Sequence, residues 1–120
     1  MRRTGQAKYG NRKVTYNGIR FDSQKEARRW QELLLMERAD KISDLRRQVR
    51  YELIPVQRIN GKCVERAVVY IADFVYRDDK GHLVVEDVKG YRDPQSAGYA
   101  KFVLKRKLML WVHHIRVKEV

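Results

Sequence analysis

Three segments rich in β-branched and aromatic residues lie between two segments with helical spacing, and this order limits the folds that the chain can adopt. Short runs containing Gly, Asn and Asp separate the three segments, as expected for turns between strands. The segments therefore predict an antiparallel meander, with Pro55 marking an end or a bulge near an edge of the first strand. They cover residues 46–59, 65–77 and 82–90, with turns at 60–62 and 78–81.

Both helical segments carry their own boundary and face signals. A helix is predicted over residues 23–39, where Ser23 is a good N-cap and Glu26 follows three residues later in the capping-box pattern. A second helix is predicted over residues 98–111, with its apolar side chains on one stripe and its basic side chains largely off it. The predicted stripe consists of Ala100, Val103, Leu104, Leu108 and Trp111.

The two ends of the chain complete the predicted order. Residues 14–21 alternate around an Asn-Gly pair, which is a strong signal for a tight hairpin before the first helix. Residues 113–120 predict a last strand, in which His113 and His114 face opposite ways and are structural rather than joint metal ligands. The predicted order is helix, three strands, helix, strand, which indicates an α/β fold.

At 120 residues and 14.4 kDa, the chain is expected to form one domain with one modest core. The polar segment 1–14 predicts a basic flexible arm, so the predicted domain covers residues 15–120. The sequence has no run of about 18 apolar residues that predicts a membrane span, and its basic N-terminus lacks the apolar part of a secretory signal. Cys63 is the single cysteine, which excludes a disulfide framework and fits a reducing cytoplasm.

The net charge of +12 is unevenly distributed along the chain. Residues 1–21 hold six basic residues and no acid, residues 98–120 hold six and one, and the remainder is almost balanced. Positive charge gathered at both ends is typical of a protein that binds a polyanion, because phosphates neutralised by Lys or Arg release counterions. A nucleic acid is therefore the expected partner.

Two acids interrupt strand segments that should be apolar on one side. Asp73 falls on the same predicted side as Val69 and Ile71, and Asp87 falls on the apolar side of its own strand. Because the turn at 78–81 joins these two strands, Asp73 and Asp87 are predicted to lie near each other at one end of the sheet. Two converging carboxylates repel each other unless they share a cation.

The same alternation places Lys89 on the face of Asp87 and puts Glu86 on the other face. Carboxylate oxygens, with the main-chain carbonyl of Val88 as a further donor, suit Mg²⁺, for which Mn²⁺ can substitute. A lysine beside such a site can orient the attacking water and offset charge on a phosphoryl group. The alternative is a structural salt bridge at the end of a sheet.

Asp73 followed by Asp87-Val88-Lys89, within this order of elements, resembles the PD-(D/E)xK nuclease superfamily. That superfamily includes restriction endonucleases and Holliday-junction resolvases, and the resemblance implies a restriction-endonuclease-like core with a mixed four-stranded sheet flanked by helices. Stretches such as RFDSQKEARRW, YIADF and VVEDVKG are similar to small phage and prophage nuclease-like proteins over about residues 15–118. Ala72 departs from the motif, which has proline there, but that proline has no chemical role.

The resemblance implies roles for further residues. It adds Glu26 to the catalytic and metal-binding set of Asp73, Asp87 and Lys89, although helix capping is a complete structural account of Glu26. It places Gln48 near the site, where the alternative is an ordinary turn residue. Lys105 could approach the scissile phosphate, and other basic residues are expected to contact backbone phosphates. The predicted DNA-binding residues are Arg2, Arg3, Lys8, Arg12, Lys13, Lys101, Lys105, Arg106 and Lys107.

The expected function is a Mg²⁺-dependent endonuclease acting on branched double-stranded DNA, preferably a phage-type Holliday-junction resolvase. The chain is too small for a separate base-reading module, and junction enzymes recognise shape and backbone. One chain offers one site and two strands are cut, so a homodimer is expected, through apolar surface near the first helix or the hairpin at 14–21. The alternatives are a phage DNA-processing nickase of broader substrate range and a non-catalytic basic DNA-binding protein.

Overall fold

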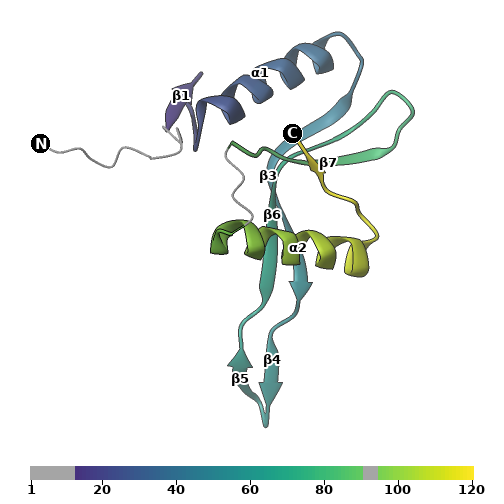
Figure 1. Ribbon diagram of the computed structural model, residues 1–120. Helices are drawn as coiled ribbons and strands as arrows, with labels where there is room; N and C mark the ends of the chain where they lie inside the picture. The colour runs from purple at the N-terminus through teal and green to yellow at the C-terminus, as the bar shows by residue number, and fades with distance from the viewer. Residues whose placement is uncertain (1–12, 91–94) are drawn as a thin grey trace, which may run out of the picture.

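The computed structural model describes residues 13–90 and 95–120, and it forms an α/β fold with two helices and a four-stranded mixed sheet (Figure 1). The main sheet has the strand order β3-β6-β7-β8, in which β3, β6 and β7 are antiparallel neighbours and β8 is parallel to β7. The predicted order of elements is confirmed. In chain order the elements are β1 (Val14–Tyr16), β2 (Ile19–Phe21), α1 (Gln24–Arg38), β3 (Ser43–Ile54), β4 (Gln57–Ile59), β5 (Lys62–Glu65), β6 (Val68–Arg77), β7 (Leu83–Asp87), α2 (Ala97–His113) and β8 (Lys118–Glu119).

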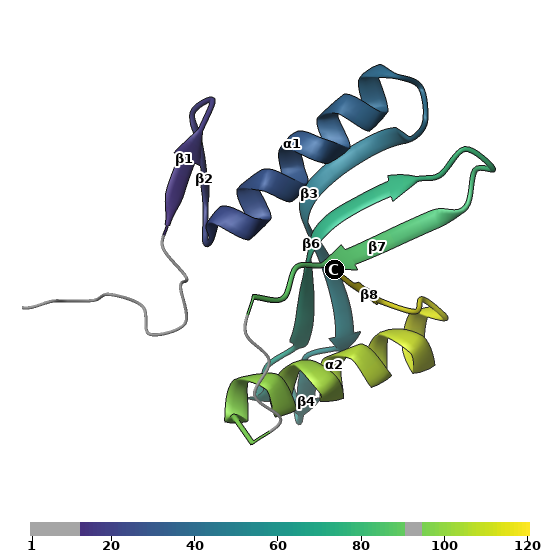
Figure 2. The same ribbon diagram turned by 45° about the horizontal axis from the view of Figure 1, so that its top comes forward.

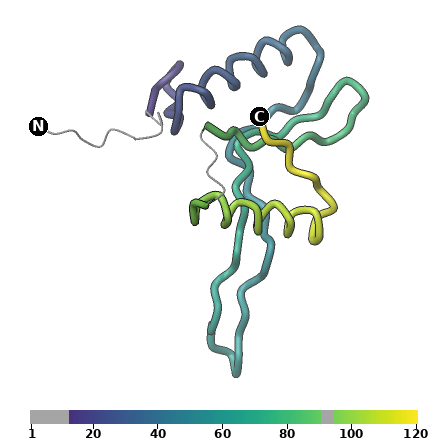
Figure 3. The backbone as a smooth tube through the Cα atoms, in the orientation of Figure 1, coloured from purple at the N-terminus to yellow at the C-terminus, as the bar shows by residue number. Residues whose placement is uncertain are grey.

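Two hairpins stand apart from the main sheet. β1 and β2 form the predicted hairpin around Asn17-Gly18, where both residues have positive φ as a tight primed turn requires. The turn expected directly between the first two strands of the meander is instead the tip of an extra hairpin, β4–β5, which continues outward from β3 and β6 (Figure 3). β3 ends at Ile54, directly before Pro55, so the predicted strand end is confirmed.

The helices are capped by side chains that the local sequence supplies. The Ser23 hydroxyl accepts a hydrogen bond from the Glu26 N–H at 3.1 Å, which confirms the predicted N-cap of α1. α2 begins after Ser96 and ends at His113, with His114 as a left-handed C-cap. The two histidines therefore end a helix, and the prediction that they lie in a strand was wrong. His113 Nε2 lies 2.6 Å from the carbonyl oxygen of Glu52 in β3.

Two apolar clusters hold the helices against different parts of the sheet (Figure 2). The α1 cluster consists of Phe21, Ala27, Leu33, Ile42, Phe74 and Tyr76, and the α2 cluster of Leu53, Tyr70, Ala72, Val75, Val85, Phe102, Met109 and Val117. The predicted apolar stripe of α2 was partly wrong, because Leu104 and Trp111 are 59% and 80% exposed. Phe102 and Met109 fill the buried face instead, since the helix is apolar on more than one side.

The strict alternation of faces breaks where β3 and β6 lie beside each other at Gln48 and Asp73. The register pairs Arg47 with Phe74 and Val49 with Ala72, so Gln48 and Asp73 are opposite each other. Before this point Leu45 packs on the α1 cluster, and after it Val49 packs on the α2 cluster. Gln48 has φ of 54°, a left-handed conformation that rotates the strand.

β6 also changes the cluster against which its side chains pack between its first and second halves. Tyr70 and Ala72 belong to the α2 cluster, whereas Phe74 and Tyr76 belong to the α1 cluster. The expectation that Asp73 shares a buried side with Ile71 was therefore wrong, because Ile71 is 50% exposed. Asp73 lies at the point where the strand changes faces, so its carboxylate is directed neither into the α1 cluster nor into the α2 cluster.

Candidate active site

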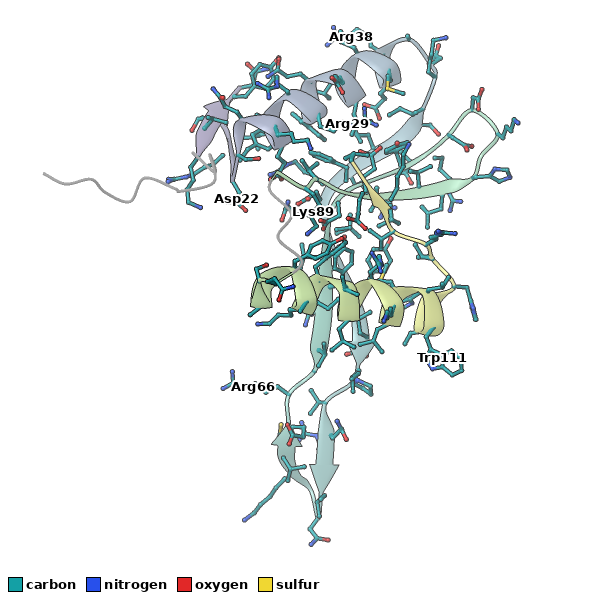
Figure 4. The ribbon with its side chains drawn as sticks, viewed as in Figure 1. Asp22, Arg29, Arg38, Arg66, Lys89 and Trp111 are labelled. Carbon is teal, nitrogen blue, oxygen red and sulfur yellow. The ribbon has the colours of Figure 1, made fainter. Side chains whose placement is uncertain are left out.

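The middle of β6, the end of β7 and the start of α1 bring three acids to one open pocket of about 440 Å³, which a lysine from the segment after β7 also lines. The last paired residues of β6 and β7 are Phe74 and Glu86, so Asp73 and Asp87 occupy the next position, where the strands separate. Glu26 reaches the pocket from the first turn of α1 and Lys89 from the segment after β7. Figure 4 labels two residues that line this pocket, Asp22 and Lys89, near the start of α1. The pocket is lined by Lys13, Asp22, Ser23, Glu26, Asp73, Asp87, Val88, Lys89 and Gly90.

Gln48 links two of the acids. Its Nε2 donates to Glu26 Oε2 at 3.2 Å and to Asp73 Oδ1 at 3.4 Å. The other oxygen of Asp73, Oδ2, accepts the Val88 N–H at 2.8 Å. The unusual backbone of Gln48 therefore places its amide between α1 and β6, and the expectation that Gln48 lies near the site is confirmed.

Asp87 and Lys89 form a close ion pair on one face, as the alternation predicted. Lys89 Nζ lies 2.8 Å from Asp87 Oδ2, and the Tyr70 hydroxyl donates to Asp87 Oδ1 at 2.7 Å. The Lys89 ammonium also lies 3.6 Å from the centre of the Phe102 ring, a cation–π contact from α2. The backbone of Val120 bonds to both Asp87 and Lys89 and fixes this strand end to the chain terminus.

Tyr70 is a residue of the site that the sequence did not indicate. Its position was predicted to be on the opposite side from Asp73, and only the exchange of faces in β6 brings it to Asp87. Burial, together with the neighbouring charge of Asp87, raises the pKa of the Tyr70 hydroxyl, so it stays a hydrogen-bond donor to that carboxylate.

The pocket holds more negative charge than its own cations neutralise. Burial, and then the nearby charge of Asp87, raises the pKa of Asp73 to about 7. Burial and the charge of Asp22 also raise the pKa of Glu26, while the Arg47 guanidinium opposes that shift. Carboxyl groups with raised pKa values in a pocket are typical of functional sites.

The donor set of this pocket fits a hard divalent cation. Within the described part of the chain, no three His, Cys, Asp or Glu side chains already converge on one point as a metal site. Mg²⁺ nevertheless needs only one or two carboxylates because it keeps several waters and takes substrate oxygens. Asp73, Asp87, Glu26 and the main-chain oxygen of Val88 are the residues that would hold it, since all four line the pocket.

The opposite face of β7 carries a second acidic site of a different kind. Glu86 is fully buried and accepts from Arg29 Nε at 2.9 Å and from Arg29 Nη2 at 2.6 Å. The Tyr76 hydroxyl also donates to Glu86, and Glu32 binds the outer side of the guanidinium at 3.0 Å. The alternation predicted that Glu86 faces away from Asp87, but nothing in the sequence identified Arg29 as its partner.

The predicted DNA-binding residues fall in several places. Lys13 lines the acidic pocket and pairs with Asp22 at 3.1 Å. Lys101 and Lys105 line a second pocket between α2 and β6, and Lys107 lies farther along α2. Arg106 pairs with Glu119 at 3.0 Å, so it is less free for a phosphate than predicted. Arg2, Arg3, Lys8 and Arg12 lie outside the described residues, as does most of the predicted arm 1–14.

Exposed apolar side chains gather away from the surface expected for a dimer. In α1 only Leu35 is a large exposed apolar residue among those that the structure describes, and the β1–β2 hairpin presents none. The exposed apolar residues of α2 are Leu104, Leu110, Trp111 and Val112. Trp111 is 80% exposed, whereas the other tryptophan, Trp30, stacks on Phe74.

Comparison with known families finds one family model that matches most of the chain. The chain belongs to the family described as protein of unknown function (DUF1064), whose family model matches residues 6–118. Comparisons with curated proteins and with solved structures find no match. No helix in the described ranges has the length and apolarity needed to cross a membrane.

Proposed function

We propose that this DUF1064 protein is a metal-dependent, structure-selective DNA endonuclease, most specifically a Holliday-junction resolvase of phage type working in the host cytoplasm. The observation that carries the proposal is that Asp73, Asp87 and Glu26 line one open pocket together with Lys89. We also propose that the sheet and its helices are a restriction-endonuclease-like core. The strand order β3-β6-β7-β8, with a parallel last strand after α2, supports this assignment.

The residues of the pocket have separate roles in phosphodiester hydrolysis. Mg²⁺ or Mn²⁺, when bound, would polarise the phosphoryl oxygen and lower the pKa of a water. Asp73, Asp87, Glu26 and the Val88 main-chain oxygen are the groups that would hold the cation. Lys89 orients the attacking water and offsets negative charge that develops on the phosphoryl group.

Two further residues position this machinery. Tyr70 fixes the Asp87 carboxylate through its 2.7 Å hydrogen bond. Gln48 holds Glu26 and Asp73 in a common orientation through its two amide contacts. Pre-arranged charges of this kind contribute to rate because they need little rearrangement during the reaction.

The charge of the chain supports DNA as the substrate. A net charge of +12 favours a polyanion, because phosphates that are neutralised by Lys or Arg release counterions. Recognition of a branched backbone requires only such charge and shape. Because each chain carries one site and a junction needs two cuts, we propose that the active form is a homodimer.

Cleavage of synthetic DNA in the presence and absence of Mg²⁺ tests the proposal. Wild-type protein should cut four-way junctions only with Mg²⁺ or Mn²⁺, and Asp87→Asn should abolish cleavage while binding is retained. Asp79→Asn, in the exposed turn after β6, is the matched control and should cut normally. Equal cutting of forks and linear duplex would favour the broader nickase. Binding with no cleavage under either metal would leave a non-catalytic DNA-binding protein.

A further inference from the structure

The β4–β5 hairpin contributes no residue to the pocket of the proposed active site. We call residues 55–66 the β-arm. Every one of these residues is exposed, and β4 and β5 pack mainly against each other. Figures 1 and 3 show the β-arm extending beyond α2, away from α1. A two-stranded ribbon without a third strand or a helix beside it is marginally stable in water.

The side chains of the β-arm are those of a surface that binds a polyanion. Arg58, Lys62 and Arg66 are basic, and Glu65 is its one acid. Ile59 is 62% exposed, so apolar surface also faces solvent. Exposed apolar residues on a projecting ribbon are typical of a surface that a partner covers.

The pairing register shows that both faces of the ribbon carry positive charge. Cross-strand partners share a face, so Arg58 lies with Cys63 and Ile59 lies with Lys62. A ribbon that docks on a protein surface would place its apolar residues on one face and its charges on the other. Cations on both faces instead suit a ribbon that lies in a DNA groove, where backbone phosphates border it on both sides.

We propose that the β-arm enters the major groove of duplex DNA beside the cleavage site, so that it holds one arm of the branched substrate. This inference rests on the proposed nuclease function, because it names the part of the substrate that lies beyond the scissile phosphate. The major groove of B-DNA admits a two-stranded β-ribbon, whereas the deep, narrow major groove of duplex RNA does not.

A basic pocket connects the acidic pocket with the β-arm. Lys101 and Lys105 of α2 line it together with Tyr70 and Ile71 of β6. Tyr70 also bonds to Asp87, and Phe102 of the same pocket lies under Lys89, so the two pockets are adjacent. β6 continues from there toward Arg66, which projects to the same side as Asp22 and Lys89 in Figure 4. A duplex can follow this route over consecutive cations.

The length of β5 and β6 sets the reach of the β-arm. Gly61, at its tip, precedes Asp73 by 12 residues. At about 3.3 Å per residue, the tip lies at most about 40 Å from the acidic pocket. That distance corresponds to about 12 base pairs of B-DNA at roughly 3.4 Å per base pair. The β-arm should therefore affect only substrates whose arms are long enough to reach it.

The experiment compares two triple variants with equal loss of charge. Arg58→Ala/Lys62→Ala/Arg66→Ala removes the cations of the β-arm. Arg38→Ala/Lys41→Ala/Lys80→Ala removes three exposed cations from the opposite end of the molecule, where α1 and the β6–β7 turn lie (Figure 1). Dissociation constants are measured by fluorescence anisotropy with Ca²⁺ in place of Mg²⁺, on GC-rich four-way junctions with arms of 8 or 20 base pairs.

With 20-base-pair arms, the β-arm variant should bind roughly 10- to 100-fold more weakly, and the slope of log K against log salt should fall by up to about 2.7. The control variant should stay within about threefold of wild type. With 8-base-pair arms, the loss in the β-arm variant should be several-fold smaller, because only Arg66, which precedes Asp73 by 7 residues, lies within about 23 Å of the acidic pocket. The single-turnover cleavage rate of the β-arm variant with Mg²⁺ at saturating protein should match that of wild type, because the acidic pocket is unchanged.

Three results would overturn the inference: equal binding by the β-arm variant and its control on long arms, the same loss on short arms, or no DNA binding by wild type. Conversion of a wild-type dimer to a monomer by the β-arm variant in sedimentation velocity would also overturn it, by assigning the β-arm to a second copy. Failure of the proposed function gives a separate result, in which wild type binds DNA through the β-arm but does not cut it with Mg²⁺ or Mn²⁺.

Discussion

Two neighbouring acids on β7, Glu86 and Asp87, illustrate two different uses of a buried carboxylate. Glu86 faces α1, is fully buried, and has hydrogen bonds from Arg29 to both of its oxygens. Asp87 faces an open pocket, where it meets Lys89 and lies close enough to Asp73 to raise the pKa of that residue. The Glu86 carboxylate is neutralised by Arg29 and has no exposed surface, whereas the pocket of Asp87 combines excess negative charge with access for a ligand.

The comparison teaches that burial of an acid does not by itself indicate function. A carboxylate whose charge and hydrogen bonds are fully satisfied inside the protein has no capacity left for a metal or a substrate. A functional carboxylate retains unsatisfied charge, a raised pKa and an open side. Substitutions at the Glu86 site should therefore lower stability, whereas substitutions at the Asp87 site should lower activity.

The largest expected effect is on stability at the Glu86 site. Arg29→Ala leaves Glu86 buried without its cation and should lower the free energy of unfolding by about 3–5 kcal/mol. Urea denaturation followed by circular dichroism measures this loss. Arg28→Ala, at the neighbouring exposed position, is the control and should change stability by less than about 0.5 kcal/mol. Equal stability of the two variants would show that the buried ion pair does not hold α1 on the sheet.

The next effect is on catalysis at the Asp87 site. Lys89→Ala should lower the single-turnover cleavage rate by about 10²- to 10³-fold, because an ammonium that offsets developing charge is lost. The unfolding free energy should change less than in Arg29→Ala, because Asp87 borders an open pocket and keeps its hydrogen bond from Tyr70, whereas Glu86 is fully buried. Lys80→Ala in the exposed β6–β7 turn should cut at the wild-type rate. A Lys89→Ala protein with undiminished cleavage would remove the lysine from the proposed mechanism.

A pH-dependent effect of smaller size is expected from Asp73. The pKa of Asp73 is about 7 in the folded chain against an ordinary value of 3.8, so the folded chain binds a proton that the unfolded chain lacks between these values. In EDTA, the free energy of unfolding should therefore fall as the pH rises from about 4 to about 8, by up to about 2 kcal/mol for a half-buried group.

Asp73→Asn cannot titrate and should flatten this pH profile, whereas Asp79→Asn in the exposed turn should keep the wild-type slope. Glu26, whose pKa is also raised, should leave a weaker slope of the same sign in Asp73→Asn. Chemical denaturation at a series of pH values measures all three proteins. A wild-type stability that rises steadily over this range would contradict the assigned electrostatics.

The smallest effect concerns the backbone at Gln48. Gln48→Gly accepts the left-handed conformation without strain but loses the amide, so it should change stability by less than about 1 kcal/mol and slow cleavage by about tenfold. Gln48→Val loses the same amide and must also adopt a φ that a β-branched residue disfavours, which should cost about 1–2 kcal/mol more. Equal unfolding midpoints for the two variants would show that the left-handed conformation at Gln48 is not required for folding.

Much of the local structure could be predicted because it depends on neighbours in the chain. The cap at Ser23, the Asn17-Gly18 turn and the alternation that separates Glu86 from Asp87 need only local hydrogen bonds and backbone preferences. The proximity of Asp73 and Asp87 was also predictable, because one short turn joins their strands. The buried face of α2 was not predictable, since that helix is apolar on more than one side and tertiary contacts chose Phe102 and Met109.

By itself, the sequence determined the order of the elements, the excess of positive charge and the presence of two aspartates on adjoining strands. Tertiary structure alone decided that β3 and β6 change faces at Gln48 and Asp73, because that change depends on a backbone conformation stabilised by contacts between distant elements. The same change brought Tyr70 to Asp87. Periodicity in a sequence assumes an uninterrupted strand, and a single left-handed residue reverses which side chains face the site.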